Sequence, residues 1–560
     1  MSVRLLMIAL APMAMLWLGS CQAVDAPRTR QATYDLVIRN GQIMDGSGEG
    51  MFRADVGVRD GVIAFIGRIA SGGGKTELDA ANEAVAPGFI DVHTHVDDDI
   101  GRLRFAENFV RDGVTTVITG NCGESVRDIR AFLARIRSRG AGVNIATLVG
   151  QNTILRNVKG DRAGDLTRQQ MQQAKGLVRQ AMLDGALGMS TGLIYAPGSF
   201  SSTGEIIELQ KVAAEHGGIY ATHMRSEGEG ILRAIDEAIA VAREARCRLQ
   251  ISHFKLSSDL SKSMGGPGIA LSRIDRARRS GVEIWLDQYP YAASSTTIET
   301  LIPDGFLADG SRAARARLDD SRQVERLILA MREFHEVQRN RAHLGYVVIS
   351  TSEGYPQWAG LNLIEVAQRM KLSARRGFEV DPRGVSPDEM PAVTMEDQYR
   401  AVIAIFRKGE STCVFHGMKE ADVESILRSP VVCIGSDSGI REFGVGQPHP
   451  RGYGTHARVL GRYVRERRVI TLQEAVRKMT YLPATAFGLS GRGLLRVGYC
   501  ADITVFSPDT VMDMATYANP HQYPRGIRHV IVNGRLVLRD GKLTGQLAGR
   551  AIYGPGCRAD

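Results

Sequence analysis

The chain has 560 residues, of which 44% are hydrophobic and 23% are charged, and its formal net charge is +9. This composition is typical of a globular protein, and the length excludes a single small core and suits a large barrel with additional elements. The basic runs at 276–279 and 465–468 have no interleaved aromatic residues. They favour solvated surfaces, and no nucleic-acid partner is predicted.

The N-terminus has the pattern of a signal peptide. Arg4 precedes an apolar run over 5–18 that is short for a membrane span. The following Leu-Gly-Ser-Cys21 resembles the cleavage box of bacterial lipoproteins, whose cysteine receives lipid, and Gln22 resembles the outer-membrane sorting signal. We therefore predict a signal peptide over 1–21, a tether over 22–32 and a lipid anchor at Cys21, with the protein facing the periplasm. Plain secretion with an incidental Cys21 is the alternative.

Both ends of the remaining chain predict short β-strands. Segments 34–44, 55–67, 501–506 and 529–541 contain alternating apolar residues around Asn-Gly and Asp-Gly turns. We predict one small β-sandwich domain assembled from residues 33–84 and 490–555. The six cysteines after Cys21 are widely spaced without a CxxC motif and do not indicate a disulfide framework.

The middle of the chain, 85–489, alternates strand and helix patterns. The predicted strands are Ala84–His95, Thr115–Asn121, Val143–Gly150, Ala186–Gly192, Ile219–His223, Arg248–His253, Val282–Tyr289 and Val431–Asp437. Helices are predicted over 127–137, 167–184, 204–216, 228–245 and 269–280. Eight such units predict an α/β fold, a (β/α)8 TIM barrel with its chemistry at the carboxyl ends of the strands. The stretch 299–394 between strands seven and eight is predicted to be an insertion, which either covers the barrel mouth or lies away from it.

The first barrel strand ends in Asp91-Val-His93-Thr-His95. Side chains two apart on a strand share a face, so both imidazoles can meet one point beyond the strand, with Asp91 on the same side. Converging neutral imidazoles are suitable ligands for zinc. Two unrelated histidines are the alternative.

Later strand ends each add a reactive side chain: Cys122, His223, His253 with Lys255, and Asp437. A single buried histidine or cysteine usually has only a packing role. Several such groups at the strand ends of one barrel instead predict a metal-dependent site.

These residues lie in recognisable motifs: Pro87–His95, Gly113–Gly123, Thr222–Arg225, Ser252–Lys255, Tyr289–Tyr291, Gly435–Asp437, His449–His456 and Met479–Gly488. The set resembles the amidohydrolase superfamily and, within it, the D-aminoacylases (N-acyl-D-amino-acid deacylases). The resemblance extends over nearly all of the chain after the tether. Many dinuclear amidohydrolases use a carboxylated lysine on strand four, which is absent from residues 185–192 here. Cys122 is the natural substitute, because a thiolate binds zinc well.

The resemblance implies a tightly held zinc on Cys122, His223 and His253, and a second, weaker position between His93, His95 and Cys122. Asp437 suits a general base that takes a proton from a zinc-acidified water and passes it to the leaving amine; a plain ligand or structural role is its alternative. By resemblance, Lys255, Tyr289 and Arg451 bind the substrate α-carboxylate, which arginine can pair bidentately. For Arg225 and Glu227 we predict an ion pair that holds their loop.

The predicted function is zinc-dependent hydrolysis of N-acyl-D-amino acids, with the D preference taken from the resemblance alone. Hydrolysis of another amide, such as a D-amino-acid dipeptide or a cell-wall fragment, is a related alternative. A surface lipoprotein that only binds ligands is the alternative from a different class, but none of the metal or base positions is missing. Specificity is expected to depend on residues 294–298 and on the insertion.

Overall fold

The computed structural model describes residues 33–377, 380 and 385–557. Within these residues, no helix is long and apolar enough to cross a bilayer. The predicted signal peptide, the anchor cysteine and the tether lie outside the described residues.

The two chain ends form one nine-stranded sheet in the order β21-β20-β19-β18-β5-β1-β2-β3, with β4 paired to β1. Its strands are β1 (Tyr34–Ile43), β2 (Phe52–Arg59), β3 (Val62–Gly67), β4 (Gly74–Asp79), β5 (Ala84–Pro87), β18 (Ile503–Phe506), β19 (Ile527–Val532), β20 (Arg535–Arg539) and β21 (Lys542–Leu543). β5 joins the two halves, because it pairs with β1 on one side and with β18 on the other. The small β domain predicted from both termini is present as a single sheet, and the predicted bounds 33–84 and 490–555 stay a prediction.

The residues of two tight turns explain two hairpins of this sheet. At Asp60–Gly61 both residues have positive φ, 54° and 79°, and Asn533–Gly534 repeats this with 47° and 80°. Such values are those of the tight hairpin turns that Asn-Gly and Asp-Gly favour. The prediction of a turn at Asn40–Gly41 is wrong: Asn40 has φ 59°, but the pairing of β1 with β2 shifts register there, so the dipeptide forms a bulge inside β1.

The barrel strands are all parallel to their neighbours. They are β6 (Phe89–Asp91), β7 (Val114–Thr119), β8 (Asn144–Thr147), β9 (Val149–Gly150), β10 (Gly188–Gly192), β11 (Ile219–His223), β12 (Leu249–Ile251), β13 (Ile284–Gln288) and β17 (Val432–Ile434). Each overlaps one of the eight predicted segments, with β8 and β9 sharing the third. The barrel-type fold predicted from the alternation is confirmed.

Backbone contacts link the first and last of these strands. Thr94 and Ser438 form a parallel bridge. The amide of His95 donates to Ser438 O at 3.0 Å, and the amide of Asp437 donates to His93 O at 2.8 Å. The residues that follow β6 and β17 are therefore neighbours in space.

Helices connect the strands and cover the outside of the barrel. They are α1 (Glu107–Arg111), α2 (Ile129–Arg139), α3 (Gln151–Lys159), α4 (Arg168–Leu183), α5 (Thr203–Glu215), α6 (Ile231–Ala245), α7 (Ser258–Met264), α8 (Gly268–Arg279), α13 (Glu420–Leu427), α14 (Arg451–Arg458), α15 (Leu472–Met479) and α16 (Tyr481–Phe487). α4 begins where predicted because Thr167 and Gln170 form a capping box.

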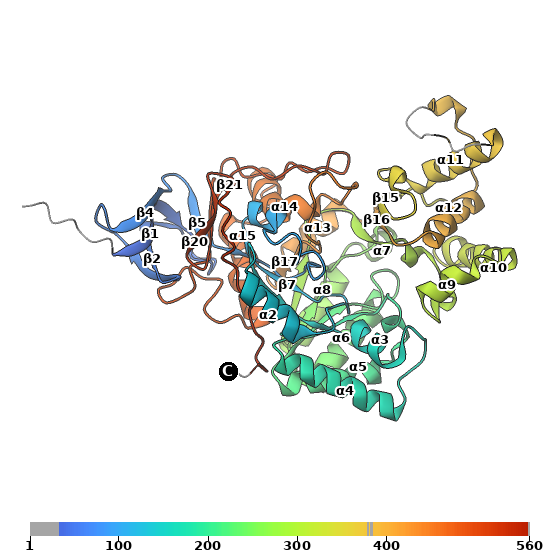
Figure 1. The fold of residues 1–560 in the computed structure, drawn as a ribbon, viewed down its shortest axis with the longest axis horizontal. Coiled ribbons are helices and arrows are strands. Elements are labelled where there is room, and N and C mark those ends of the chain that lie inside the picture. Colours follow the sequence, from blue (N-terminus) through green and yellow to red (C-terminus); the bar gives the residue numbers. More distant parts are fainter. Residues whose placement is uncertain (1–32, 378–379, 381–384, 558–560) are drawn as a thin grey trace, which may run out of the picture.

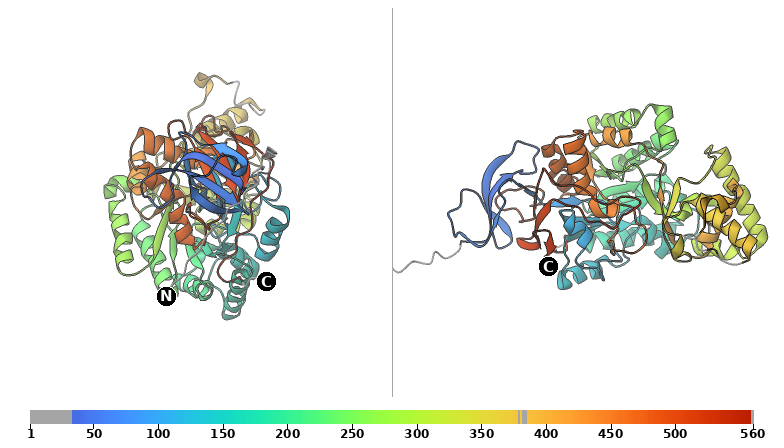
Figure 2. Two further views of the ribbon diagram at one scale, coloured as in Figure 1. Left: turned by 90° about the vertical axis from the view of Figure 1, so that its left-hand side faces the viewer. Right: turned by 90° about the horizontal axis from the view of Figure 1, so that it is seen from above.

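The segment between β13 and β17 forms a unit with its own apolar core, which includes Leu327 and Phe406. It contains β14 (Ser294–Thr297), α9 (Ser311–Arg317), α10 (Ser321–Arg332), β15 (Val347–Ser352), α11 (Leu363–Arg376), α12 (Met395–Arg407) and β16 (Ser411–Phe415). β16 pairs with both β14 and β15, so the unit extends beyond 299–394 on both sides. The barrel lies between this insertion and the β domain (Figure 1, Figure 2).

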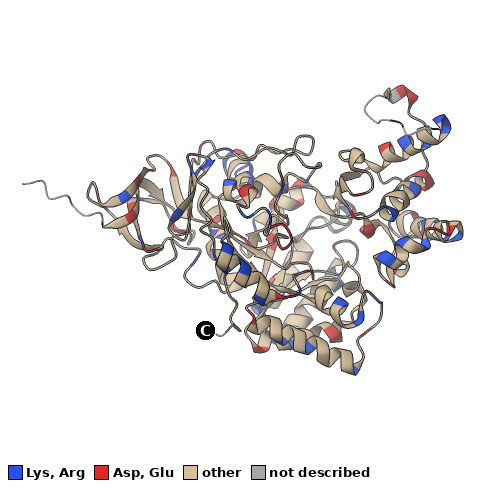
Figure 3. Cartoon of the chain, in the orientation of Figure 1, with Lys and Arg blue, Asp and Glu red and all other residues tan. Residues whose placement is uncertain are grey.

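The last described residues run along the base of the barrel. Gly549 donates its amide to Ala141 O at 2.7 Å, and Ile552 donates to Ile145 O at 2.8 Å. Basic and acidic residues are interspersed along the helices in Figure 3, including those of the insertion.

Candidate metal centre

Five strand ends meet around one point at the carboxyl end of the barrel. They supply His93 and His95 after β6, Cys122 after β7, His223 at the end of β11, His253 after β12 and Asp437 after β17. All of these side chains are buried except that of His95, which is 36% exposed. The structure thus brings together every predicted metal ligand and the predicted base.

Cys122 is at the centre of the cluster. Its Sγ lies 3.3 Å from His93 Nε2, 3.5 Å from His253 Nε2 and 3.7 Å from His223 Nδ1. Zinc binds sulfur at roughly 2.3 Å and imidazole nitrogen at roughly 2.0 Å, so tetrahedral ligand atoms are about 3.3–3.8 Å apart. The observed separations match that spacing, and the donor set of one thiolate with imidazoles fits zinc.

A second group of donors adjoins the first. Asp437 Oδ1 lies 3.1 Å from His95 Nε2 and 3.5 Å from His93 Nε2. Donor atoms of His93, Cys122, His253 and Asp437 all lie within 4.8 Å of one another. The cluster therefore has donors for a further cation on the side of His95, where the sequence predicted the weaker position.

Three of these residues have left-handed backbone conformations. The φ angles are 53° at Cys122, 34° at His253 and 52° at Asp437. Non-glycine residues adopt such angles at a cost of about 1–3 kcal/mol, and only where the surroundings enforce them. Two hydrogen bonds help to hold these conformations: the amide of His253 donates to Asp287 Oδ1, and the amide of Asp437 donates to His93 O. The strained conformations aim the side chains at a common point.

The pKa values follow from burial and mutual contact. Burial alone would raise the pKa of Cys122, but His93, His223 and His253 outweigh it and hold that pKa well below its usual value. Burial would also raise the pKa of Asp437, yet Arg451, His93 and His95 lower it well below its usual range. Both groups therefore favour the deprotonated form, which ligation and proton acceptance require.

Asp287 supports two ligands at once and was not predicted. Its Oδ1 accepts the amide of His253 at 2.7 Å and lies 3.2 Å from His93 Nδ1. Its Oδ2 accepts Gln250 Nε2 at 2.8 Å. A carboxylate on the outer nitrogen of a ligating imidazole fixes the tautomer that leaves the inner nitrogen free.

Glu227 supports the outer nitrogen of His253 in the same way. The predicted ion pair between Arg225 and Glu227 is wrong. Glu227 Oε1 lies 2.9 Å from His253 Nδ1 and bonds the ammonium of Lys255. Arg225 instead pairs with Glu237 at 3.0 Å. The sequence spacing suggested a local pair. Because β11 and β12 lie side by side, Glu227 after β11 instead contacts His253 and Lys255 after β12.

The predicted substrate-binding residues lie next to the cluster. Arg451 Nη1 lies 2.8 Å from Asp437 Oδ2, and its Cζ lies 4.8 Å from the centroid of the Tyr289 ring. Lys255 Nζ lies 5.7 Å from the same centroid. Two cations thus lie against one buried aromatic ring, within reach of the metal ligands.

The first strand of the insertion reaches this site. Tyr195, whose ring lies 5.1 Å from that of His223, has its hydroxyl 2.8 Å from Thr296 Oγ1 on β14. Arg451 Nη2 donates to Ser295 O at 3.1 Å. β14 therefore forms part of the wall of the site, where the sequence placed a specificity region.

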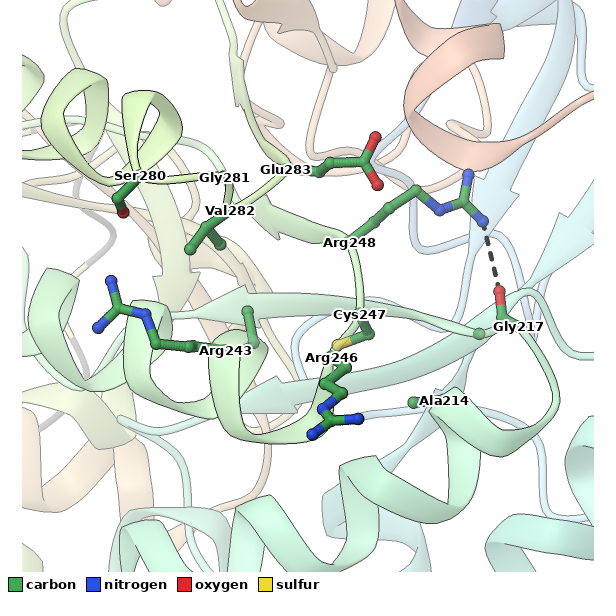
Figure 4. Close-up of a pocket in the computed structure, with 12 residues that line it drawn as sticks. Ala214, Gly217, Arg243, Arg246, Cys247, Arg248, Ser280, Gly281, Val282 and Glu283 are labelled. Atoms are coloured by element: carbon green, nitrogen blue, oxygen red, sulfur yellow. Dashed lines mark hydrogen bonds between the residues drawn. The ribbon is translucent and has the colours of Figure 1, made fainter.

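A cavity of about 540 Å³ lies at the other end of the barrel (Figure 4). Cys247 and three arginines, Arg243, Arg246 and Arg248, line it. Arg248 donates to Gly217 O at 3.3 Å and to Ala486 O at 3.0 Å. The helices α5, α6 and α8 end at this cavity, and cations there balance the negative ends of helix dipoles. Its arginines therefore have a structural explanation.

Comparison with known proteins agrees with this geometry. The sequence profile described as the amidohydrolase family matches residues 76–538. The D-aminoacylase of Alcaligenes xylosoxydans xylosoxydans is 34% identical over 546 residues, which are 93% of this chain and 97% of that protein. The chain belongs to the D-aminoacylase family of metal-dependent amidohydrolases. Residues 18–86 also match the profile of the urease α-subunit N-terminal domain.

Solved D-aminoacylase structures extend the likeness to three dimensions. A crystal structure of D-aminoacylase matches with a TM-score of 0.75 at 32% identity, covering 93% of this chain and all of that one. N-acyl-D-glutamate deacylase from Bordetella bronchiseptica, in complex with zinc and a phosphonate mimic of the tetrahedral intermediate, matches with a TM-score of 0.75 at 31% identity and the same coverage. A dihydropyrimidinase at 16% identity and TM-score 0.53 shares the fold.

Proposed function

We propose that this amidohydrolase uses zinc to hydrolyse the amide bond of N-acyl-D-amino acids, giving a carboxylate and a free D-amino acid. The observation that carries the proposal is the thiolate of Cys122 surrounded by three imidazoles at zinc spacing, with Asp437 beside them. The D-amino-acid class is supported by relatives named for D-aminoacylase and N-acyl-D-glutamate deacylase activity at 34% identity.

Cys122, His223 and His253 would hold the tight zinc, and His93 and His95 with Cys122 the weaker one. Zinc in such a site supplies Lewis-acid polarisation and lowers the pKa of a water to roughly 7. The carboxylates of Asp287 and Glu227 keep the outer nitrogens of His93 and His253 occupied, which orients both rings.

Asp437 moves the proton. Its lowered pKa leaves it ionised at neutral pH, so it can accept a proton from the attacking water. It then delivers that proton to the amide nitrogen, which departs as an amine and not as an amide anion. The arginine at 451 holds the carboxylate in place at 2.8 Å.

The part of the site that binds the substrate α-carboxylate is formed by Lys255, Arg451 and Tyr289. Both cations lie against the Tyr289 ring and next to the metal ligands. A carboxylate bound there fixes the distance between the scissile amide and Asp437. Tyr195, which is half-buried, adds a hydroxyl whose pKa is raised well above its usual value by desolvation, so that it stays a donor.

The test is a screen of N-acetyl D- and L-amino acids with purified mature protein and zinc. We expect amine release from several D substrates and at least tenfold less from their L enantiomers. Enzyme stripped of metal and then reloaded is the control for metal dependence. Absence of hydrolysis of every D substrate by zinc-loaded protein would overturn the proposal.

We further propose that the protein is lipid-anchored through Cys21 and faces the periplasm. The variant Cys21→Ala should therefore move the protein from the membrane fraction to the soluble fraction. Unchanged fractionation would count against the anchor. The support is the Leu-Gly-Ser-Cys21 sequence that closes the apolar segment.

A further inference from the structure

A half-buried arginine beside Asp437 has no acidic partner. Arg441 lies in the loop between β17 and α14, and its Nε donates to Ser438 Oγ at 3.0 Å. Ser438 directly follows the predicted base. Within residues 33–377, 380 and 385–557, no carboxylate forms an ion pair with Arg441, and its two terminal nitrogens have no hydrogen-bond partner.

The other two cations of the site differ from it in this respect. Lys255 is paired with Glu227, and Arg451 is paired with Asp437. Taking a charge out of water without a partner costs free energy that a counter-ion recovers. Arg441 therefore differs from Lys255 and Arg451, because no carboxylate of the described residues lies within ion-pair distance of it.

The chain makes room for this side chain. A Cβ at Gly452 would lie 2.9 Å from both Cγ and Nε of Arg441, so a larger residue there would displace the arginine. Gly452 directly follows Arg451. The stem of Arg441 is thus held between the residue after the base and the residue after a substrate-binding arginine.

Electrostatics agree with this placement. Burial and Arg451 lower the pKa of Arg441 to about 10, although Tyr453, Asp99 and Asp437 raise it in part. The guanidinium remains charged at neutral pH. Because Nε is occupied by Ser438, the free edge formed by Nη1 and Nη2 has the fork geometry that binds a carboxylate through two parallel hydrogen bonds.

We propose that Arg441 binds a second carboxylate of the substrate, so that the preferred substrates are dianionic N-acyl-D-amino acids. The second carboxylate belongs either to the amino-acid side chain or to the acyl group. This inference rests on the proposed function, since it concerns the same site. It adds a specificity-determining residue to the Lys255, Tyr289 and Arg451 set.

The test measures kcat/KM for three substrates on one enzyme preparation: N-acetyl-D-glutamate, N-succinyl-D-leucine and the monoanionic N-acetyl-D-leucine. We expect one of the dianions to exceed N-acetyl-D-leucine by at least tenfold. In Arg441→Met this ratio should fall by about tenfold or more, and Arg441→Lys should restore part of it. Because each ratio is taken within one preparation, a lower folded fraction does not affect it.

Arg102→Met is the matched control, because Arg102 is an exposed arginine near the same loop that already pairs with Glu442 at 2.6 Å. Its ratio should change less than twofold. Preference for N-acetyl-D-glutamate assigns the second carboxylate to the side chain, and preference for N-succinyl-D-leucine assigns it to the acyl group. Equal turnover of all three substrates, or an unchanged ratio in Arg441→Met, would overturn the inference. If no substrate is hydrolysed, the proposed function itself fails.

Discussion

The two ends of the barrel each place a cysteine among nitrogen-bearing side chains, but with opposite consequences. At the carboxyl end, the histidines around Cys122 lower its pKa well below the usual value. At the amino end, burial raises the pKa of Cys247 to about 11, although arginines line the same cavity. Imidazoles present lone pairs that can share a cation with a thiolate, whereas guanidinium groups present none.

The two ends also show that the larger cavity and the reactive side chains lie at different ends of the barrel. The amino end has an open cavity of about 540 Å³, yet its arginines sit where three helices end. The carboxyl end is filled by buried donors within 4.8 Å of one another. Which end reacts is therefore decided by converging donor atoms and supporting carboxylates, not by empty volume.

The largest expected effect comes from removing the thiolate. The purified protein should contain about one tightly bound zinc, and Cys122→Ala should lose it together with hydrolysis, because Cys122 supplies the soft ligand at the centre of the cluster. Metal analysis by mass spectrometry after dialysis measures this. Cys247→Ala is the matched control at the other end and should keep its zinc. Full metal content in Cys122→Ala would break the comparison.

Asp437→Asn should keep the metal and lose turnover. An amide cannot accept the proton of the attacking water, and removing such a group costs about 10²–10⁴ in kcat. Steady-state kinetics with metal analysis on the same sample separate the two properties. Turnover close to that of the parent enzyme would remove Asp437 from proton transfer.

Asp287→Ala tests the carboxylate behind the ligands. It removes the acceptor for His93 Nδ1 and for the strained His253 amide, so zinc affinity should fall about 10–100-fold. Competition against a chelator gives the affinity. Asp287→Asn retains an oxygen acceptor and should lose less. Equal affinity in all three proteins would show that the ligands are oriented without it.

The smallest effect is expected at the amino end. Arg243 lies in the last turn of α6, and Arg243→Gln should lower the free energy of unfolding by about 0.3–1 kcal/mol through the helix dipole. Urea denaturation measures this change, and kcat/KM should be unaltered. A loss of hydrolysis in this variant would mean that the two ends are coupled.

Much of the site could be predicted from the sequence because its ligands follow strands. Each of His93, Cys122, His253 and Asp437 comes within three residues of a barrel strand, where the fold concentrates chemistry. Each motif is also a short run of sequence, so these ligands could be predicted without knowing which strands pair or how far apart the side chains lie.

The supporting carboxylates could not be predicted in this way. Asp287 acts on His93 and His253, which follow different strands. The parallel pairing of β12 with β13 brings it beside His253, and β17, which pairs with β13 and is bridged to the residues after β6, brings it beside His93. The Arg225–Glu227 error has the same origin, since spacing along the chain suggested a pair that neighbouring strands replaced. Likewise the Asn40–Gly41 dipeptide is typical of a turn, but β2 pairs with β1 on both sides of it, so that the dipeptide forms a bulge.

The pairing of β5 with β18 has a consequence for how the protein is made. β5 is synthesised early, but its antiparallel partner follows only after the entire barrel, and the strip that runs along the barrel base comes later still. During synthesis an unpaired strand edge therefore stays exposed while most of the polypeptide emerges, which is the kind of edge on which other chains aggregate. Truncation from the C-terminus should for this reason lower the yield of folded protein before it removes any catalytic group.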